Sequence, residues 1–164
     1  MTRNIDIKKD RLRYTKNSTS STQAYIAILF NVLYFVSVYS YNEHAGEFYH
    51  TFTIGLSVIC NLLFLLMSFL FSEGVKNYKL AHCIAFIPLG VFQVIRIFNI
   101  PLSAYTYRYL YNGSITRVMD DKQFIYTCVC LGCSALACFA TAFTGIRKTK
   151  MLREYEESLA NNNQ

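Results

Sequence analysis

The charged residue that lies deepest in an apolar stretch of this chain is Arg96, in the segment FQVIRIFNIP. Gln93, Arg96 and Asn99 follow one another at a spacing of three, which places them along one drifting face of a helix. An ionisable residue at membrane depth is by default a candidate functional site. Such a polar face could line an anion-favouring path through a small oligomeric transporter or channel.

Arg96 also has structural explanations. It lies four residues before Ile100, so its Cα would sit about 6 Å below the outer boundary of the bilayer. From there the side chain could snorkel to the lipid headgroups, or it could pair with a carboxylate of a flanking connection. The acidic candidates are Glu43, Glu47, Asp120 and Asp121. We expect one of these two roles, with contact to a partner protein or a ligand as the alternative.

Two further amides, Asn31 and Asn61, stand alone in apolar surroundings. Buried amides hydrogen-bond across helices and stabilise packing by about 0.6 kcal/mol each, so we expect both to hold helices together. The apolar segments contain no Asp or Glu, and a carboxylate proton relay therefore has no candidate residue.

The segment CVCLGC contains a C-x-x-C motif at Cys130 and Cys133. A four-helix membrane protein with this motif near the outward end of its last helix resembles the vitamin K epoxide reductase family. The resemblance implies a thiol-disulfide oxidoreductase that passes electrons from a thioredoxin-like partner to a quinone. That family has a second cysteine pair in its first external segment, whereas residues 41–51 hold none here. Thiols in apolar helices usually pack as inert small groups, so redox chemistry is the alternative reading.

Metal chemistry has few candidate ligands. His44 and His50 lie in a polar connection beside Glu43 and Glu47, a setting typical of a solvated loop. We expect no metal site, no cofactor and no catalytic activity. A net charge of +6 also suggests nucleic acid, but the basic residues flank apolar segments and form no soluble basic domain.

Tyrosine recurs at every second position in YTYRYLYNGSITRVM, at Tyr105, Tyr107, Tyr109 and Tyr111. The following Asn-Gly pair predicts a β-hairpin with a two-residue turn, spanning about residues 104–120. This register places Leu110 opposite Ile115 and Arg108 opposite Arg117. Like charges opposite one another destabilise a ladder, so the two arginines should seek an acidic partner. We expect this hairpin to be a docking surface.

The elements that must position these residues are four apolar segments, at about residues 23–41, 52–72, 80–100 and 123–146. Each is long enough to cross a bilayer, which takes about 20 helical residues. With 53% hydrophobic residues overall and no polar face on the second and fourth segments, a soluble bundle is excluded. The sequence predicts an all-α integral membrane protein, a four-helix transmembrane bundle with one small external hairpin.

The distribution of Lys and Arg predicts the orientation, because basic residues concentrate in cytoplasmic segments. Residues 1–22 form a basic tail and residues 147–164 a charged tail, whereas the connection at residues 41–51 has no Lys or Arg. Both termini are therefore expected in the cytoplasm, with residues 23–146 as a multi-pass domain of the plasma (cytoplasmic) membrane. The last helix should continue a few turns past Gly145.

The fourth apolar segment carries a stripe of small residues, which lets another helix approach closely. It serves either an intramolecular seam or an interface with another subunit, and it includes Cys130, Ser134, Ala137 and Thr141. Without a catalytic constellation, the sequence favours a non-catalytic accessory or assembly subunit of a larger membrane complex such as a transporter. Its expected partners are the lipid bilayer and other membrane subunits or further copies of itself.

Overall fold

A computed structural model describes residue 7 and residues 10–38, 55–99 and 101–162 of the chain. Its long helices are α2 (Ser18–Val38), α4 (Gly55–Lys76), α5 (Leu80–Asn99) and α7 (Asp121–Asn162). All four are long and apolar enough to span a membrane. They confirm the prediction of a helical bundle with four helices that could cross a membrane.

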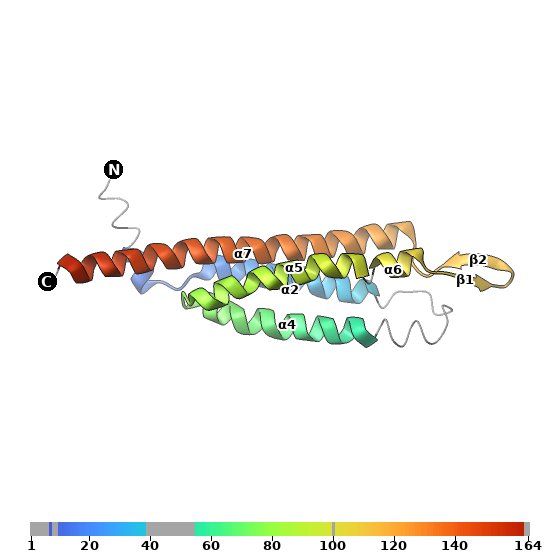
Figure 1. Cartoon of the computed structure of the whole chain (residues 1–164), viewed down its shortest axis with the longest axis horizontal. Coiled ribbons are helices and arrows are strands. Elements are labelled where there is room, and N and C mark those ends of the chain that lie inside the picture. Colours follow the sequence, from blue (N-terminus) through green and yellow to red (C-terminus); the bar gives the residue numbers. More distant parts are fainter. Residues whose placement is uncertain (1–6, 8–9, 39–54, 100, 163–164) are drawn as a thin grey trace.

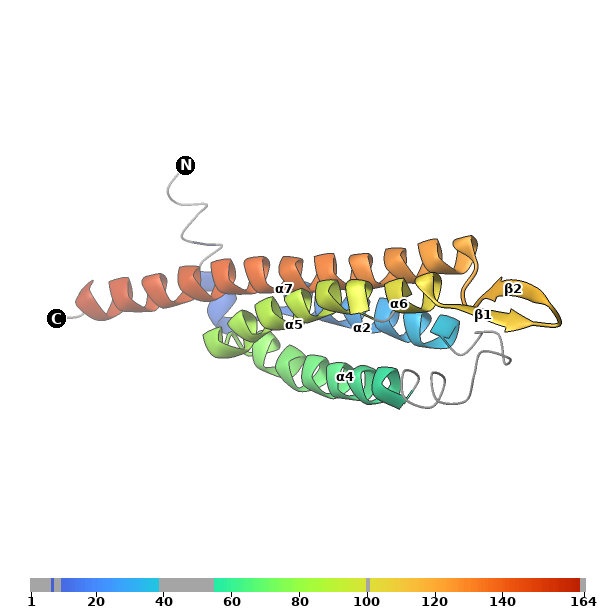
Figure 2. The same cartoon turned by 45° about the vertical axis from the view of Figure 1, so that its right-hand side comes forward.

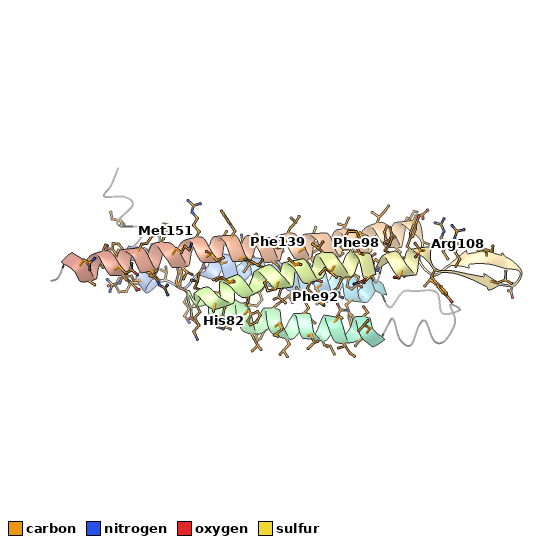
Figure 3. The ribbon with its side chains drawn as sticks, in the orientation of Figure 1. His82, Phe92, Phe98, Arg108, Phe139 and Met151 are labelled. Carbon is orange, nitrogen blue, oxygen red and sulfur yellow. The ribbon has the colours of Figure 1, made fainter. Side chains whose placement is uncertain are left out.

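The four helices pack in a closed ring. α7 contacts α2 and α5, and α4 contacts the same two helices from the other side. In Figures 1 and 2, α7 runs along one edge of the bundle and α4 along the opposite edge, with α2 and α5 between them. Each helix therefore has two neighbours and keeps an outward face of apolar side chains (Figure 3).

Small residues on α7 allow this close packing. Cys130, Ser134, Cys138 and Ala142, spaced by four, are all buried. A Cβ placed on Gly145 would lie 2.8 Å from Sγ of Cys83 on α5, so a larger residue would push the two helices apart. The part of the stripe that is buried forms an intramolecular seam, one of the two roles expected from its sequence.

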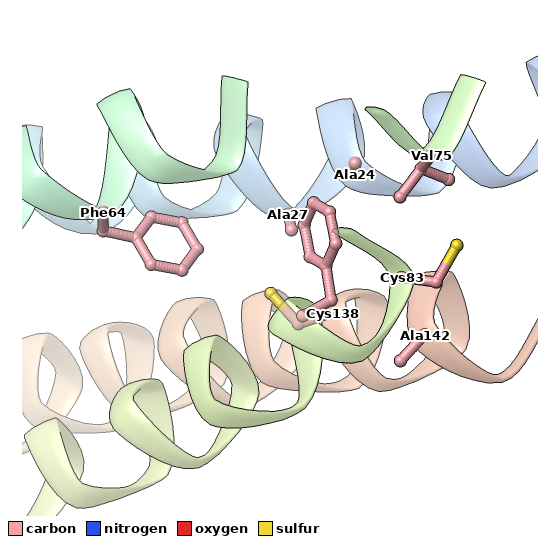
Figure 4. Packing of buried hydrophobic residues seen from close by; sticks show 8 residues of the cluster. Ala24, Ala27, Phe64, Val75, Cys83, Cys138 and Ala142 are labelled. Atoms are coloured by element: carbon pink, nitrogen blue, oxygen red, sulfur yellow. The ribbon is translucent and has the colours of Figure 1, made fainter. Parts of the chain in front are cut away.

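Two apolar clusters fill the inside of the ring. One lies toward the hairpin and is formed by Tyr34, Ala104, Val118, Met119, Cys130 and Leu131. The other lies toward the α4–α5 turn and includes the side chains labelled in Figure 4 together with Phe86. On α2, Asn31 falls between Ala27 of one cluster and Tyr34 of the other. A polar layer thus separates the two apolar clusters.

The helix ends differ from the expected ones for local reasons. α2 begins at Ser18, ahead of residue 23, because Asn17 caps it: the backbone N–H of Ser20 donates to Oδ1 of Asn17 at 3.4 Å. α7 runs without a break to Asn162, so most of the charged tail is helical. The expected ends at residues 41, 52 and 100 lie outside the described residues.

The connection between α5 and α7 begins with a short helix, α6 (Pro101–Thr106), followed by strands β1 (Arg108–Tyr111) and β2 (Ser114–Arg117). The strands pair antiparallel, with Leu110 opposite Ile115. Asn112 and Gly113 have φ angles of 50° and 80°, as a two-residue I′ turn requires.

The strands are shorter than the tyrosine alternation suggested. Tyr105 lies in α6, and Tyr107 lies between α6 and β1. Pro101 occupies the first position of α6, which its fixed φ favours, and the N–H of Tyr107 closes the last turn by donating to the carbonyl of Ser103 at 2.9 Å. The first part of the tyrosine run therefore belongs to α6 and its C-terminal end, and only Tyr109 and Tyr111 lie in a strand.

Candidate functional site

Arg96 lies inside the bundle, and only 2% of its surface is exposed. Its Nη1 donates to Oδ1 of Asn31 and to Oε1 of Gln93, both at 2.9 Å. Its Nη2 donates to Oδ1 of Asn61 at 2.6 Å. One guanidinium therefore joins α2, α4 and α5, because its fork of donors reaches several acceptors at once.

Gln93 extends this network to the fourth helix. Its Nε2 donates to Oδ1 of Asn31 at 3.0 Å and to Oγ of Ser134 at 3.1 Å. Ser134 on α7 in turn donates to the backbone carbonyl of Ala27 at 2.9 Å. All four long helices thus contribute to a single buried group, which we call the polar cluster: Asn31, Asn61, Gln93, Arg96 and Ser134.

Aromatic rings complete the surroundings of the charge. The guanidinium carbon of Arg96 lies 4.8 Å from the ring centroid of Tyr34 and 5.6 Å from that of Phe92. Rings at this distance attract a cation through their negative faces. Neither ring was predicted from the sequence to contact Arg96, although Phe92 stands four residues before it and so shares its helical face.

This position corrects the expectation that Arg96 snorkels to the lipid headgroups. A snorkelling side chain would expose its head, whereas the head of Arg96 points into the bundle and binds neutral amide oxygens. Asp121, one of the expected partners, instead accepts from Nη1 of Arg117 at 2.9 Å. Glu43 and Glu47 lie outside the described residues. The hydrogen bonds of Arg96 within the described residues go to amides on three helices.

Asn99 does not join the polar cluster. It is exposed, and its backbone carbonyl accepts a hydrogen bond from Oγ of Ser103. Three residues fall short of one full helical turn by about 60°. Each step of three therefore moves a side chain about 60° around the helix axis. Gln93 and Arg96 remain on the inner side, but the second step carries Asn99 to the outer side. The expected three-residue polar path is therefore reduced to two buried residues.

The polar cluster suits packing better than transport or acid–base chemistry. Its five members are buried, and neutral amides and a hydroxyl are poor proton carriers. Within the described part of the chain, Nδ2 of Asn31 and Nδ2 of Asn61 have no hydrogen-bond partner. The oxygen of each amide accepts from Arg96, and that of Asn31 accepts from Gln93 as well. This arrangement favours the guanidinium at the expense of the two buried amide N–H groups.

Cys130 and Cys133 both lie on α7 as free thiols. Cys130 is buried in the apolar cluster beside Tyr34 and Leu131, and Cys133 is half-buried. The motif therefore lies in the apolar interior and at its margin, where a thiol packs as a small hydrophobic group.

Arg117 is anchored at the base of the hairpin. Besides its bond to Asp121, its Nη1 donates to the hydroxyl of Tyr105 at 3.3 Å, and its guanidinium carbon lies 5.1 Å from the Tyr105 ring centroid. That ring stacks on Phe124 at a centroid distance of 4.4 Å. Asp121 is the acid that Arg117 was expected to seek. Arg108, opposite Arg117 in the ladder, is exposed (Figure 3).

The tip of the hairpin carries an apolar pair. Leu110 and Ile115 lie opposite each other, and each is 73% exposed. They share one face of the ladder with Arg108 and Arg117 because alternate residues of a strand point the same way. Tyr107 is exposed, whereas the structure does not describe the side chains of Tyr109 and Tyr111. The hairpin extends beyond the ends of the four helices (Figure 1).

No group of three or more His, Cys, Asp or Glu side chains that could hold a metal ion occurs among the described residues. His44 and His50, the metal ligands considered from the sequence, lie outside that set.

Comparisons with known protein families, with curated proteins and with solved structures find no match to this chain.

Proposed function

We propose that this protein is a non-catalytic accessory or assembly subunit of a larger membrane complex, such as a transporter. In this proposal it resides in the plasma (cytoplasmic) membrane with both termini in the cytoplasm. The hairpin then lies outside the cell and serves as the docking surface for a partner subunit. The observation that carries the proposal is the pair Leu110 and Ile115, exposed at the tip of a hairpin that reaches past the bundle.

Two features of the bundle support this role. Its small-residue seam and polar cluster are used to join its own helices, so the bundle can act as a stable support. A two-stranded hairpin alone is marginally stable in water, and this one is held at its base by Arg117, Tyr105 and Asp121. The tip, in contrast, offers apolar surface that a partner would bury at about 25 cal/mol per Å².

The alternatives draw less support from the geometry. A channel lined by Gln93, Arg96 and Asn99 would need an open polar path, whereas the first two are buried and the third is exposed on the outer side. A redox enzyme based on Cys130 and Cys133 would need access to a buried thiol.

The test is affinity purification of the tagged chain in mild detergent at native expression, followed by mass spectrometry. The double variant Leu110→Ser/Ile115→Ser should lose a co-purifying membrane protein by tenfold or more. The control Leu110→Val/Ile115→Val keeps both positions apolar and suited to a strand, and it should retain the partner. Recovery of the chain alone would contradict the proposal. Equal recovery of the partner with both variants would show that the hairpin is not the docking surface.

A further inference from the structure

A pocket of about 640 Å³ lies at the end of the bundle opposite the hairpin. It is bounded by the segment that precedes α2, by the first turn of α2, by the α4–α5 turn and by α7. We call it the basic pocket, after four of the residues that line it: Arg11, Lys16, Arg147 and Lys148. None of the lining residues that the structure describes is acidic.

The cations of the basic pocket are not neutralised by the ion pairs found in the described part of the chain. Those nearest to it join Arg13 to Asp10 and Lys76 to Glu73. Lys148 donates to the neutral Oδ1 of Asn17 at 3.1 Å. Like charges that converge on a hollow repel one another, and a hollow lined by one sign of charge concentrates the opposite ion. The pocket is therefore suited to an anion.

The first turn of α2 adds to this field. Ser18 and Thr19 line the pocket, so the positive end of a 21-residue helix borders it. The dipole of a helix favours an anion such as phosphate near its N-terminus. The four cations and the helix end come from separate parts of the chain and attract the same kind of ligand.

The level of the pocket along the helices favours a lipid over a soluble anion. Phe143 lines it and is 69% exposed. This ring lies one turn before Arg147 on α7, and residues 123–146 carry no charge. The pocket thus crosses the level at which the apolar helix ends and the basic residues begin. A phospholipid has its phosphate at this level and its acyl chains along the apolar side.

We propose that the basic pocket binds an anionic phospholipid. Its phosphate contacts Arg11, Lys16 and Arg147 beside the first turn of α2, and an acyl chain lies along Phe143. This assignment does not depend on the accessory-subunit proposal, because the pocket and the hairpin lie at opposite ends of the molecule.

The test is native mass spectrometry of the full chain in nonionic detergent, titrated with dioleoylphosphatidylglycerol or dioleoylphosphatidylcholine. The anionic lipid should bind about tenfold more tightly. Arg11→Gln/Arg147→Gln should weaken its binding by about 25-fold, since each basic residue near an anionic lipid contributes about a fivefold effect. The matched control is Lys150→Gln/Arg153→Gln, which removes the same charge from exposed positions of α7 outside the pocket and should bind like the parent chain.

Equal weakening by the two double variants, or equal binding of the two lipids, would overturn the proposal. Helix content by circular dichroism checks the fold. Should Arg11→Gln/Arg147→Gln misfold, Lys16→Gln provides the same test with an expected loss of about fivefold. Inorganic phosphate and Phe143→Ser separate the two possible sources of the anion. A lipid site requires that phosphate compete weakly and that Phe143→Ser weaken lipid binding, whereas full competition by phosphate assigns the pocket to a soluble anion and rejects the lipid.

Discussion

At the scale of single residues, the decisive feature is a buried arginine bound by neutral amides. Removing a charged side chain from water is unfavourable, and the polar cluster offsets this with three hydrogen bonds from Arg96 to Asn31, Asn61 and Gln93. The rings of Tyr34 and Phe92 add cation–π attraction. Asn31 and Asn61 belong to other helices than Arg96, so the energy of these two bonds is available only when the helices are assembled.

Arg96→Met should therefore destabilise the bundle by about 2–4 kcal/mol, because it leaves three buried amide oxygens without their charged donor. The free energy of unfolding in mixed micelles, followed by circular dichroism during a titration with a denaturing detergent, measures this effect. The control Arg108→Met removes an exposed arginine of the hairpin and should change stability by less than about 0.5 kcal/mol.

A double-mutant cycle with Asn61→Leu shows whether the loss comes from the network. Arg96 and Asn61 share a 2.6 Å hydrogen bond, so their combined effect should fall short of the sum by about 1 kcal/mol or more. Strict additivity, or a stable Arg96→Met variant, would mean that the polar cluster does not hold the helices together.

At the scale of elements, the packing of α5 against α7 includes a glycine that leaves no room for a Cβ. Gly145 faces Cys83, and an added Cβ would lie 2.8 Å from Sγ and 3.3 Å from Cβ of that cysteine. Gly132, on the same helix, has open space at the corresponding point. The two glycines therefore provide a matched pair for testing the seam.

Gly145→Ala should destabilise the protein by about 1–3 kcal/mol, because the inserted methyl group overpacks the seam. Gly132→Ala should be neutral or should stabilise by up to about 1 kcal/mol, since alanine is the better helix former. Thermal melting in detergent compares the two variants. Equal melting temperatures would contradict the close approach of α5 and α7.

At the scale of the whole molecule, the ring of four helices has two different ends. One end carries the hairpin with its exposed apolar tip, and the other carries the basic pocket and the helical extension of α7 (Figure 1). The polar cluster lies between them and ties all four helices. The proposed roles are separated in space, so each can be altered without the other.

The orientation in the membrane can be tested with fusions. Green fluorescent protein at the C-terminus should fluoresce, and alkaline phosphatase inserted between Asn112 and Gly113 should be active, because the basic tails are expected in the cytoplasm. A chain with four crossings has both termini on one side, so activity of both reporters is the consistent result. An inactive phosphatase at the turn would reverse the topology and would make an external partner impossible.

Much of this architecture follows from local composition. Uncharged runs of about 20 residues must form helices in a bilayer to satisfy their backbone hydrogen bonds, and Asn112-Gly113 accepts the positive φ angles of its turn. Helix ends were less predictable because they depend on single side chains, such as the Asn17 cap and Pro101 at the start of α6.

The sequence by itself determined that Asn31, Asn61, Gln93, Arg96 and Ser134 are polar residues within apolar helices. Only the tertiary structure decided that they meet. Members that bond directly are as far apart along the chain as Arg96 and Asn31, at 65 residues, and no local pattern specifies which faces of four helices turn toward one another. The same reason applies to the basic pocket, where Arg11 and Arg147 come together because α2 and α7 pack side by side. Packing in three dimensions converts scattered polar residues into sites.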